Sequence, residues 1–285
     1  MVAHILSRQC WLSIIIGSIL MLSLQSSSAQ ISPPGLSHTK VASWMALGLD
    51  QSLDVQRSWQ SISYVGYGFM SNPSGHYNLF EKPSMFILNE ELKKKLSDHL
   101  YLTGALSYRE QYLYEKNTPY HKAALSTKRE FRIYGKLSYF WTTSRIKWNV
   151  DFRPELRTFY LPSFDADDTR KGLRGRFKLK STIPLMPNQQ HLLILSAESL
   201  FQNEMTRDAP DNSTADINQL PKPITLNNNW SGFSYDDSRF CIYYRYVPAD
   251  LPFYTEIGYM NNLAGKNPTY SMHHLGIDII FKDIF

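Results

Sequence analysis

Cysteine is nearly absent from this chain, which has only Cys10 and Cys241 among its 285 residues. Two cysteines cannot form the disulfide framework of a small secreted scaffold. Charge is also sparse, because charged residues make up 19% of the chain and the net charge is +5. A disordered chain of high net charge is therefore excluded. The small positive excess allows an anionic partner without requiring one, and we expect no nucleic-acid partner.

Long apolar runs are absent after residue 24, since no later segment holds 18 consecutive apolar residues. No transmembrane helix is therefore expected in the rest of the chain. What the sequence does contain is hydrophobic and aromatic residues, at 43% and 14%, including 18 Tyr. This composition is typical of a folded chain, and the length suits one or two domains.

The first 29 residues have the pattern of a secretion signal. Arg8 precedes an apolar run over 11–24, and Ser27 and Ala29 are the small residues expected before a cleavage site. As a helix the run is about 21 Å long, too short for a hydrocarbon core of about 30 Å. We therefore predict a signal peptide over 1–29 cleaved after Ala29, a linker over 30–40 and one domain over 41–285.

Alternation with a period of two dominates the remaining chain. In 145–160 the even positions are mostly apolar, whereas the odd positions as far as Arg157 are charged or polar. Successive side chains of a strand point to opposite faces, so this segment has one apolar and one charged face. The segments 130–141 and 170–185 repeat the pattern. Residues 142–144 join 130–141 and 145–160 as a tight hairpin.

Strands are predicted along the whole domain. The others are expected at 41–50, 60–70, 84–95, 99–114, 189–204, 238–248, 252–263 and 270–285. Within 84–95, the part 89–95 also allows a helix. The connectors alternate between short turns and long polar loops, of which the longest is 205–238. This alternation is typical of outer-membrane barrels, which have short periplasmic turns and long extracellular loops.

Three features favour a membrane barrel, with its apolar face outward, over a soluble one. About eleven strands would enclose an interior that apolar side chains hardly fill. Strands such as 145–160 exceed the 9–11 tilted residues that cross a bilayer. Aromatic residues, among them Tyr139, Trp141 and Tyr244, end the apolar faces as girdles do. The sequence thus predicts an all-β fold, an antiparallel up-and-down transmembrane β-barrel of 10 to 12 strands, in the outer membrane of a Gram-negative bacterium.

The last strand carries a further feature. In 274–285 the residues Leu275, Ile277, Phe281 and Phe285 share one face, and the chain ends in an aromatic residue. This resembles the C-terminal strand of bacterial outer-membrane proteins. The resemblance implies that Phe281 and Phe285 form a signal for the barrel assembly machinery. Asp283 departs from the pattern, because an apolar residue is usual there.

The chain also resembles an uncharacterised family of outer-membrane barrels, labelled domain of unknown function 2490. The resemblance depends on the order of hairpins and loops and on the segments REFRIYGKLSY (129–139), DFRPELR (151–157) and LRGRFKLK (173–180). It covers about 41–285 and implies no activity, cofactor or catalytic residue. Because single-chain bacterial barrels normally have an even number of strands, the count is expected to be ten or twelve, and twelve is preferred.

A charged lumen is the chemical feature that this fold implies. The residues predicted to line it are Arg109, Arg132, Lys136, Lys147, Arg153, Arg157, Arg174, Arg176, Lys178, Lys180, Arg239, Arg245, Glu130, Asp151 and Glu155. The cations outnumber the acids, and rings of Arg or Lys favour anions in pores. Alternatively, cross-strand pairs of Arg with Glu and Asp brace the wall of a filled barrel.

Three functions remain open at this point. The first is a structural barrel or a narrow anion-leaning, porin-like channel, with membrane lipid and small anionic solutes as partners. The second is a barrel-embedded enzyme that acts on lipid or glycan, although no His has a Ser two residues later and we expect no enzyme, no cofactor and no metal. The third is a secreted soluble β-protein that binds a polyanion through 170–180.

Overall fold

The chain is described by a computed structural model over residues 39–72, 77–115, 117–207, 228–265 and 270–284. These residues form twelve strands and no helix. The signal peptide, its cleavage site and the linker up to residue 38 lie outside the described residues. No helix in the described ranges has the length and apolar character needed to cross a bilayer.

The strands follow one another in chain order. They are β1 (Val41–Ser52), β2 (Trp59–Met70), β3 (Lys82–Lys95), β4 (Leu100–Tyr114), β5 (Lys122–Thr143), β6 (Ile146–Tyr160), β7 (Ala166–Pro184), β8 (His191–Arg207), β9 (Asn228–Trp230), β10 (Ser234–Tyr246), β11 (Phe253–Ala264) and β12 (Tyr270–Lys282).

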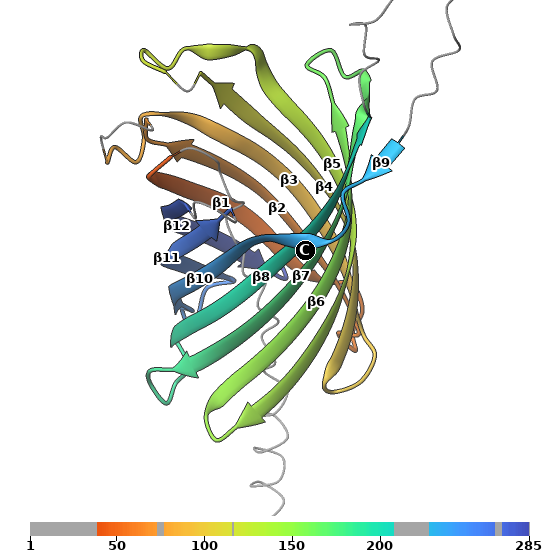
Figure 1. Ribbon diagram of the computed structural model, residues 1–285. Helices are drawn as coiled ribbons and strands as arrows, with labels where there is room; N and C mark the ends of the chain where they lie inside the picture. The colour runs from red at the N-terminus through yellow and green to blue at the C-terminus, as the bar shows by residue number, and fades with distance from the viewer. Residues whose placement is uncertain (1–38, 73–76, 116, 208–227, 266–269, 285) are drawn as a thin grey trace, which may run out of the picture. The chain divides into compact units, whose positions relative to one another are not determined.

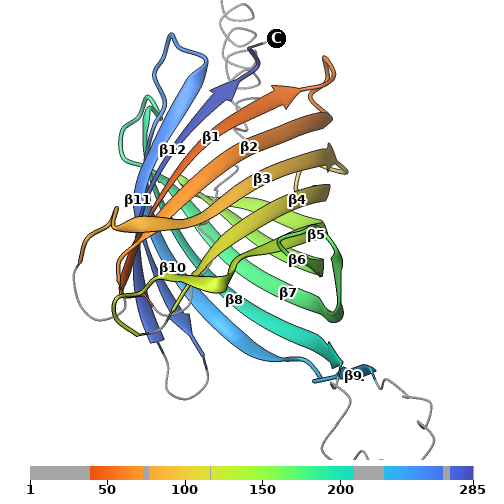
Figure 2. The same ribbon diagram turned by 90° about the horizontal axis from the view of Figure 1, so that it is seen from above.

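Eleven of these strands close into a barrel (Figures 1 and 2). Each pairs antiparallel with its neighbours in sequence, and β10 pairs with β8 over Ser234–Tyr246. The short β9 pairs with the last residues of β8, Met205–Arg207, and like β10 it runs antiparallel to β8. β9 is therefore an interrupted beginning of the same wall strand as β10, and it adds no further wall. Gly232, with φ of +78°, lies in the interruption.

The barrel closes through a parallel pair. β1 lies beside β12 with Val41 opposite His273 and Asp50 opposite Lys282. An up-and-down chain with an odd number of strands must bring its first and last strands together in parallel. The preferred count of twelve barrel strands is therefore wrong, although eleven lies within the range of 10 to 12. The assumption of an even number of strands was wrong, because β1 (Val41–Ser52) is one of the eleven wall strands.

The parallel pair also places the two ends of the barrel wall apart. Val41 lies at the end of the barrel that carries the described connector residues 71–72, 77–81, 115, 117–121 and 161–165, which we call the loop end. Lys282 lies at the opposite end, with the connectors 53–58, 96–99, 144–145, 185–190 and 247–252, which we call the turn end. The connector 161–165 is short because β7 already begins at Ala166, four residues before the predicted strand. Likewise β5 begins at Lys122, eight residues before the predicted strand 130–141.

The two faces of the wall differ as the alternation requires. Apolar side chains such as Leu106 (62%) and Ile133 (59%) are exposed on the outside. Charged side chains of the neighbouring positions are buried inside, and Arg239 (1%) and Glu256 (0%) are examples. The two-residue turn between β5 and β6 keeps the apolar side chains of both strands on the outer face. Ser144 in this turn has a φ of +55°.

Candidate functional site

The interior of the barrel holds the residues predicted to line a lumen. Ten of them are buried: Arg109, Glu130, Arg132, Glu155, Arg157, Arg174, Arg176, Lys180, Arg239 and Arg245. The other five are half-buried: Lys136, Lys147, Asp151, Arg153 and Lys178. All fifteen come from β4–β7 and β10, so the predicted site occupies one side of the wall.

Glu130 on β5 is the centre of the densest cluster. Cross-strand register places Arg109 of β4 opposite Glu130, and Arg157 of β6 opposite Arg132. Two like charges in that position repel each other. Glu130 compensates, because Arg132 donates to its two oxygens at 2.8 and 3.0 Å and Arg157 donates to Oε1. Arg109 lies 4.0 Å from Oε2, so one carboxylate serves three guanidinium groups.

A second series of ion pairs continues around the wall. Glu155 on β6 lies 2.7 Å from Arg153 and 2.8 Å from Arg176 of β7. Arg176 in turn lies 3.7 Å from Glu198 of β8. Glu198 then lies 3.4 Å from Arg239 of β10. We call the whole set the charge network; its members are Arg109, Glu130, Arg132, Arg153, Glu155, Arg157, Arg174, Arg176, Glu198 and Arg239.

Hydrogen bonds from Arg174 extend the charge network to β8 and β10. This side chain donates to Gln202 Oε1 at 2.9 Å and to Asp236 Oδ2 at 3.0 Å. The same Gln202 oxygen accepts a bond from Arg157 at 3.3 Å. Each bond joins different strands, so the network fastens β6, β7, β8 and β10 together from inside. Charge-assisted bonds of this kind are among the stronger protein hydrogen bonds.

Sequence reasoning missed several buried acids, among them Glu91 on β3. Its carboxylate accepts bonds from Tyr134 at 2.7 Å and from Lys136 at 2.6 Å, both on β5. The residue was overlooked because 89–95 also allowed a helix. Read as a strand, the segment places Asn89, Glu91 and Lys93 on one face, and all three are buried. That alternation was the available signal.

The opposite side of the interior holds an apolar cluster, although Asp50, Glu256 and Asp278 are also buried there. A cluster of buried side chains lines it next to the parallel pair, and we call it the seam cluster; its members are Ala42, Trp44, Ala46, Met70, Met85, Ile87, Tyr254, Met272 and Ile280. Trp44 on β1 packs against Gly66 on β2 so closely that a Cβ at Gly66 would overlap the indole. Tyr243 lies over Gly258 in the same way. Glycine is needed at both positions to admit these rings.

Two other groups of chemically versatile side chains lie on β12 and β10. His273 is exposed and His274 is buried, so the two adjacent side chains lie on opposite faces of β12. Cys241 is buried inside the barrel beside Met260 and Tyr243. Within the described residues, no three His, Cys, Asp or Glu side chains are grouped to hold a metal ion.

Of the two residues predicted to form an assembly signal, only Phe281 is among the described residues, near the end of β12. Phe281 is exposed on the outer face at 36%, and Phe285 lies outside the described residues. The structure also gives the unusual Asp283 a role. It accepts a bond from the Ser52 amide at 2.7 Å and lies 3.4 Å from Arg57. Although partial burial acts to raise it, the pKa of Asp283 is lowered by these contacts. Asp283 thus ties the end of β12 to the β1–β2 turn.

Comparison with known proteins gives no assignment. No protein-family model matches the chain, and no curated protein matches it significantly. The resemblance to the domain-of-unknown-function family stays a prediction. The function must therefore be argued from the barrel and from the distribution of charge in its wall.

Proposed function

We propose that the chain is an outer-membrane β-barrel protein of a Gram-negative bacterium whose interior charges brace the wall. The observation that carries the proposal is the inverted arrangement of the two faces. Apolar side chains are exposed around the barrel while Arg and Glu are buried inside it. In water this arrangement leaves a large apolar surface uncovered, whereas in a bilayer lipid covers it.

Strand length and aromatic residues support the membrane environment. The eleven wall strands have 12 to 22 residues, and about 9–11 tilted residues cross a bilayer. Rings also group near the turn end of the outer face. Trp141 and Trp148 stack with 6.1 Å between ring centres, and Tyr244 and Tyr246 both pack on His191. Such rings are typical of the level of lipid headgroups.

The bracing role follows from the pairing of the interior charges. Buried ions are tolerated when opposite charges and hydrogen bonds surround them. Glu130, Glu155 and Glu198 each contact at least two guanidinium groups from different strands. The cross-strand pairs hold neighbouring strands in register. We therefore propose that the charge network stabilises the barrel wall. The proposed partners of the chain are membrane lipid and the barrel assembly machinery.

Membrane fractionation tests the proposal. The full chain, with its first 29 residues, would be expressed in a Gram-negative host, and its outer-membrane content measured after extraction with alkaline carbonate. We expect the protein to stay in the outer membrane and to need detergent for release. Recovery in a detergent-free soluble fraction would refute the membrane assignment and favour the secreted polyanion-binding alternative. The enzyme alternative would be supported if the detergent-solubilised protein hydrolysed lipid or glycan in an activity assay.

A narrow anion-leaning passage is the second candidate, because cations gather near the loop end of the interior. Three guanidinium groups share Glu130, and Lys128 and Arg170 lie 4.3 and 5.1 Å from the Phe159 ring. Cationic rings favour anions in pores. Conductance across a planar bilayer separates the two candidates. A braced wall predicts no stable current, whereas a current selective for anions would establish the passage.

A further inference from the structure

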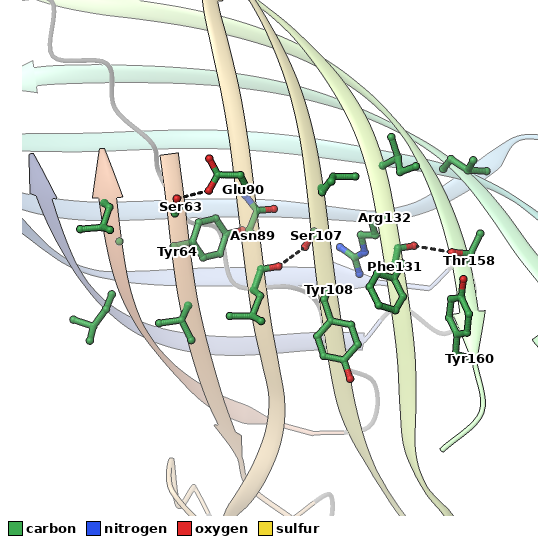
Figure 3. A pocket seen from close by; sticks show the side chains of 18 of the residues that line it. Ser63, Tyr64, Asn89, Glu90, Ser107, Tyr108, Phe131, Arg132, Thr158 and Tyr160 are labelled. Carbon is green, nitrogen blue, oxygen red and sulfur yellow. Dashed lines mark hydrogen bonds between the residues drawn. The ribbon is translucent and has the colours of Figure 1, made fainter. Parts of the chain in front are cut away.

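The outer face of the wall is hollowed over β1–β6. A depression of about 960 Å³ lies there, within the size range of ligand pockets. Most of its lining is aliphatic or aromatic and exposed on the outer face; Leu47, Val65, Leu88, Leu106, Phe131 and Ile133 are examples. Figure 3 shows the hollow with Phe131, Tyr108 and Tyr160 labelled. On the proposed membrane barrel this hollow faces lipid.

One carboxylate interrupts the apolar lining. Glu90 on β3 is exposed between Leu88 and Leu92, which are exposed on the same face. Ser61 Oγ of β2 donates to Glu90 Oε1 at 2.6 Å, and Ser63 donates to Oε2; Figure 3 shows the Ser63 bond. No ion pair within the described ranges includes Glu90. An acid on a lipid-facing surface costs free energy, so its presence calls for a cation from outside the chain.

The depth of Glu90 indicates where that cation comes from. Lys94 lies 4.9 Å from the Trp59 ring at the turn end, and such a pair of cation and aromatic residue is typical of the bilayer interface. Glu90 lies four residues before Lys94 on β3. At a strand tilt of about 45°, this places Glu90 about 9 Å deeper in the bilayer than Lys94. Ser61, which donates to the Glu90 carboxylate, lies two residues after Trp59 and therefore only about 5 Å deeper in the bilayer than Trp59. The carboxylate is therefore drawn toward the headgroups.

We propose that the hollow binds a phospholipid whose headgroup carries a primary ammonium, as phosphatidylethanolamine does. The inference rests on the proposed membrane location. The ammonium donates to Glu90 beside Ser61 and Ser63, and the acyl chains lie against Leu88, Leu106 and Ile133. A primary ammonium is a compact cation with three donors, and its bond to a carboxylate is charge-assisted. A quaternary ammonium has no N–H to donate, and an anionic headgroup is repelled.

Lipid competition followed by native mass spectrometry tests this site. The purified full chain in detergent micelles would be given equal amounts of phosphatidylethanolamine, phosphatidylcholine and phosphatidylglycerol with identical acyl chains. We expect phosphatidylethanolamine to be retained about tenfold over phosphatidylcholine, as loss of one charge-assisted bond implies. In Glu90→Gln, which keeps the side-chain size and an acceptor for the two serines, this preference is lost. The matched control is Glu81→Gln, an exposed acid immediately before the first residue of the same strand, which keeps the preference.

Three outcomes would overturn the proposal. The first is equal retention of the ethanolamine and choline lipids by the unmodified chain. The second is a preference that survives in Glu90→Gln. The third is a dimer of the unmodified chain that Glu90→Gln dissociates and Glu81→Gln does not, since the hollow would then hold a second copy of the chain. Failure of the membrane assignment is seen separately, because such a protein stays soluble before any lipid or detergent is added.

Discussion

The two sides of the barrel interior are built on different principles. On β4–β8 and β10 the charge network joins neighbouring strands through Arg and Glu side chains, and most of its members are buried. On β1–β3, β11 and β12 the seam cluster packs Trp, Met and Ile side chains together, although acids such as Glu256 and Asp278 are buried there as well. The charged side requires opposite charges to be balanced, whereas the apolar side requires shapes to match. Mutations should therefore fail for different reasons on the two sides.

The largest effect is expected from Glu130→Gln on the charged side. The substitution leaves Arg109, Arg132 and Arg157 without their shared carboxylate. Breaking a buried ion pair by removal of one partner costs about 3–5 kcal/mol. The measurement is the free energy of unfolding in urea of the barrel folded into lipid vesicles.

A second substitution sharpens this prediction. Removal of Arg157 in the double variant Glu130→Gln/Arg157→Gln takes away one of the charges that repel each other, so part of the lost stability should return. Glu81→Gln, at an exposed acid, serves as the control and should stay within about 0.5 kcal/mol of the unmodified chain. A Glu130→Gln protein as stable as that control would contradict the role of the charge network.

A smaller effect is expected from Gly66→Ala on the apolar side. The added methyl group overlaps the Trp44 indole, and overpacking of this kind costs about 1–3 kcal/mol. The matched control is Gly104→Ala on the outer face of β4, where no atom lies within 4 Å of the new Cβ. That control should be neutral or slightly stabilising. Urea unfolding of both proteins checks the difference, and equal stability would show that the seam cluster tolerates the extra volume.

The smallest effect is expected from Asp283→Asn, where β12 ends. The pKa of Asp283 in the folded chain is lowered from its ordinary value of 3.8. The carboxylate therefore stabilises the fold above its unfolded pKa, and this contribution disappears as the pH falls through the lower folded value. At neutral pH the variant should lose at most about 1 kcal/mol, because exposed ion pairs contribute little. Unfolding curves of the two proteins should converge in strong acid, and a gap that persists there would refute the assignment.

Much of the barrel could be predicted from the sequence because alternation is strong where one face is charged. In β6 and β7 the buried Arg and Glu residues alternate with mostly apolar residues of the outer face, so the sequence identifies the strand and both of its faces. The seam cluster could not be predicted in this way. Both faces of β1 are apolar, since Ala42, Trp44 and Ala46 point inward while Met45 and Leu47 point outward. Without polar contrast, the sequence does not indicate which face is buried.

The strand count and the centre of the charge network depended on information beyond local pattern. The eleven predicted segments correspond to the eleven wall strands, but the expectation of an even number obscured this. Only pairing between β1 and β12, distant in the chain, shows that an odd number closes. Similarly, the charge pattern indicates that Glu130 faces inward, but not that three guanidinium groups converge on it. That convergence depends on the stagger of β4, β5 and β6.

The parallel closure has a practical consequence for engineering this barrel. In a wall with an even number of strands, first and last residues meet at one rim, and a short linker allows circular permutation. Here Val41 and Lys282 lie at opposite rims, and β1 alone has 12 residues, about 40 Å at 3.3 Å each. A permutant needs a connector of that reach, while epitope tags placed just before Val41 and just after Lys282 would report opposite sides of whatever the barrel spans.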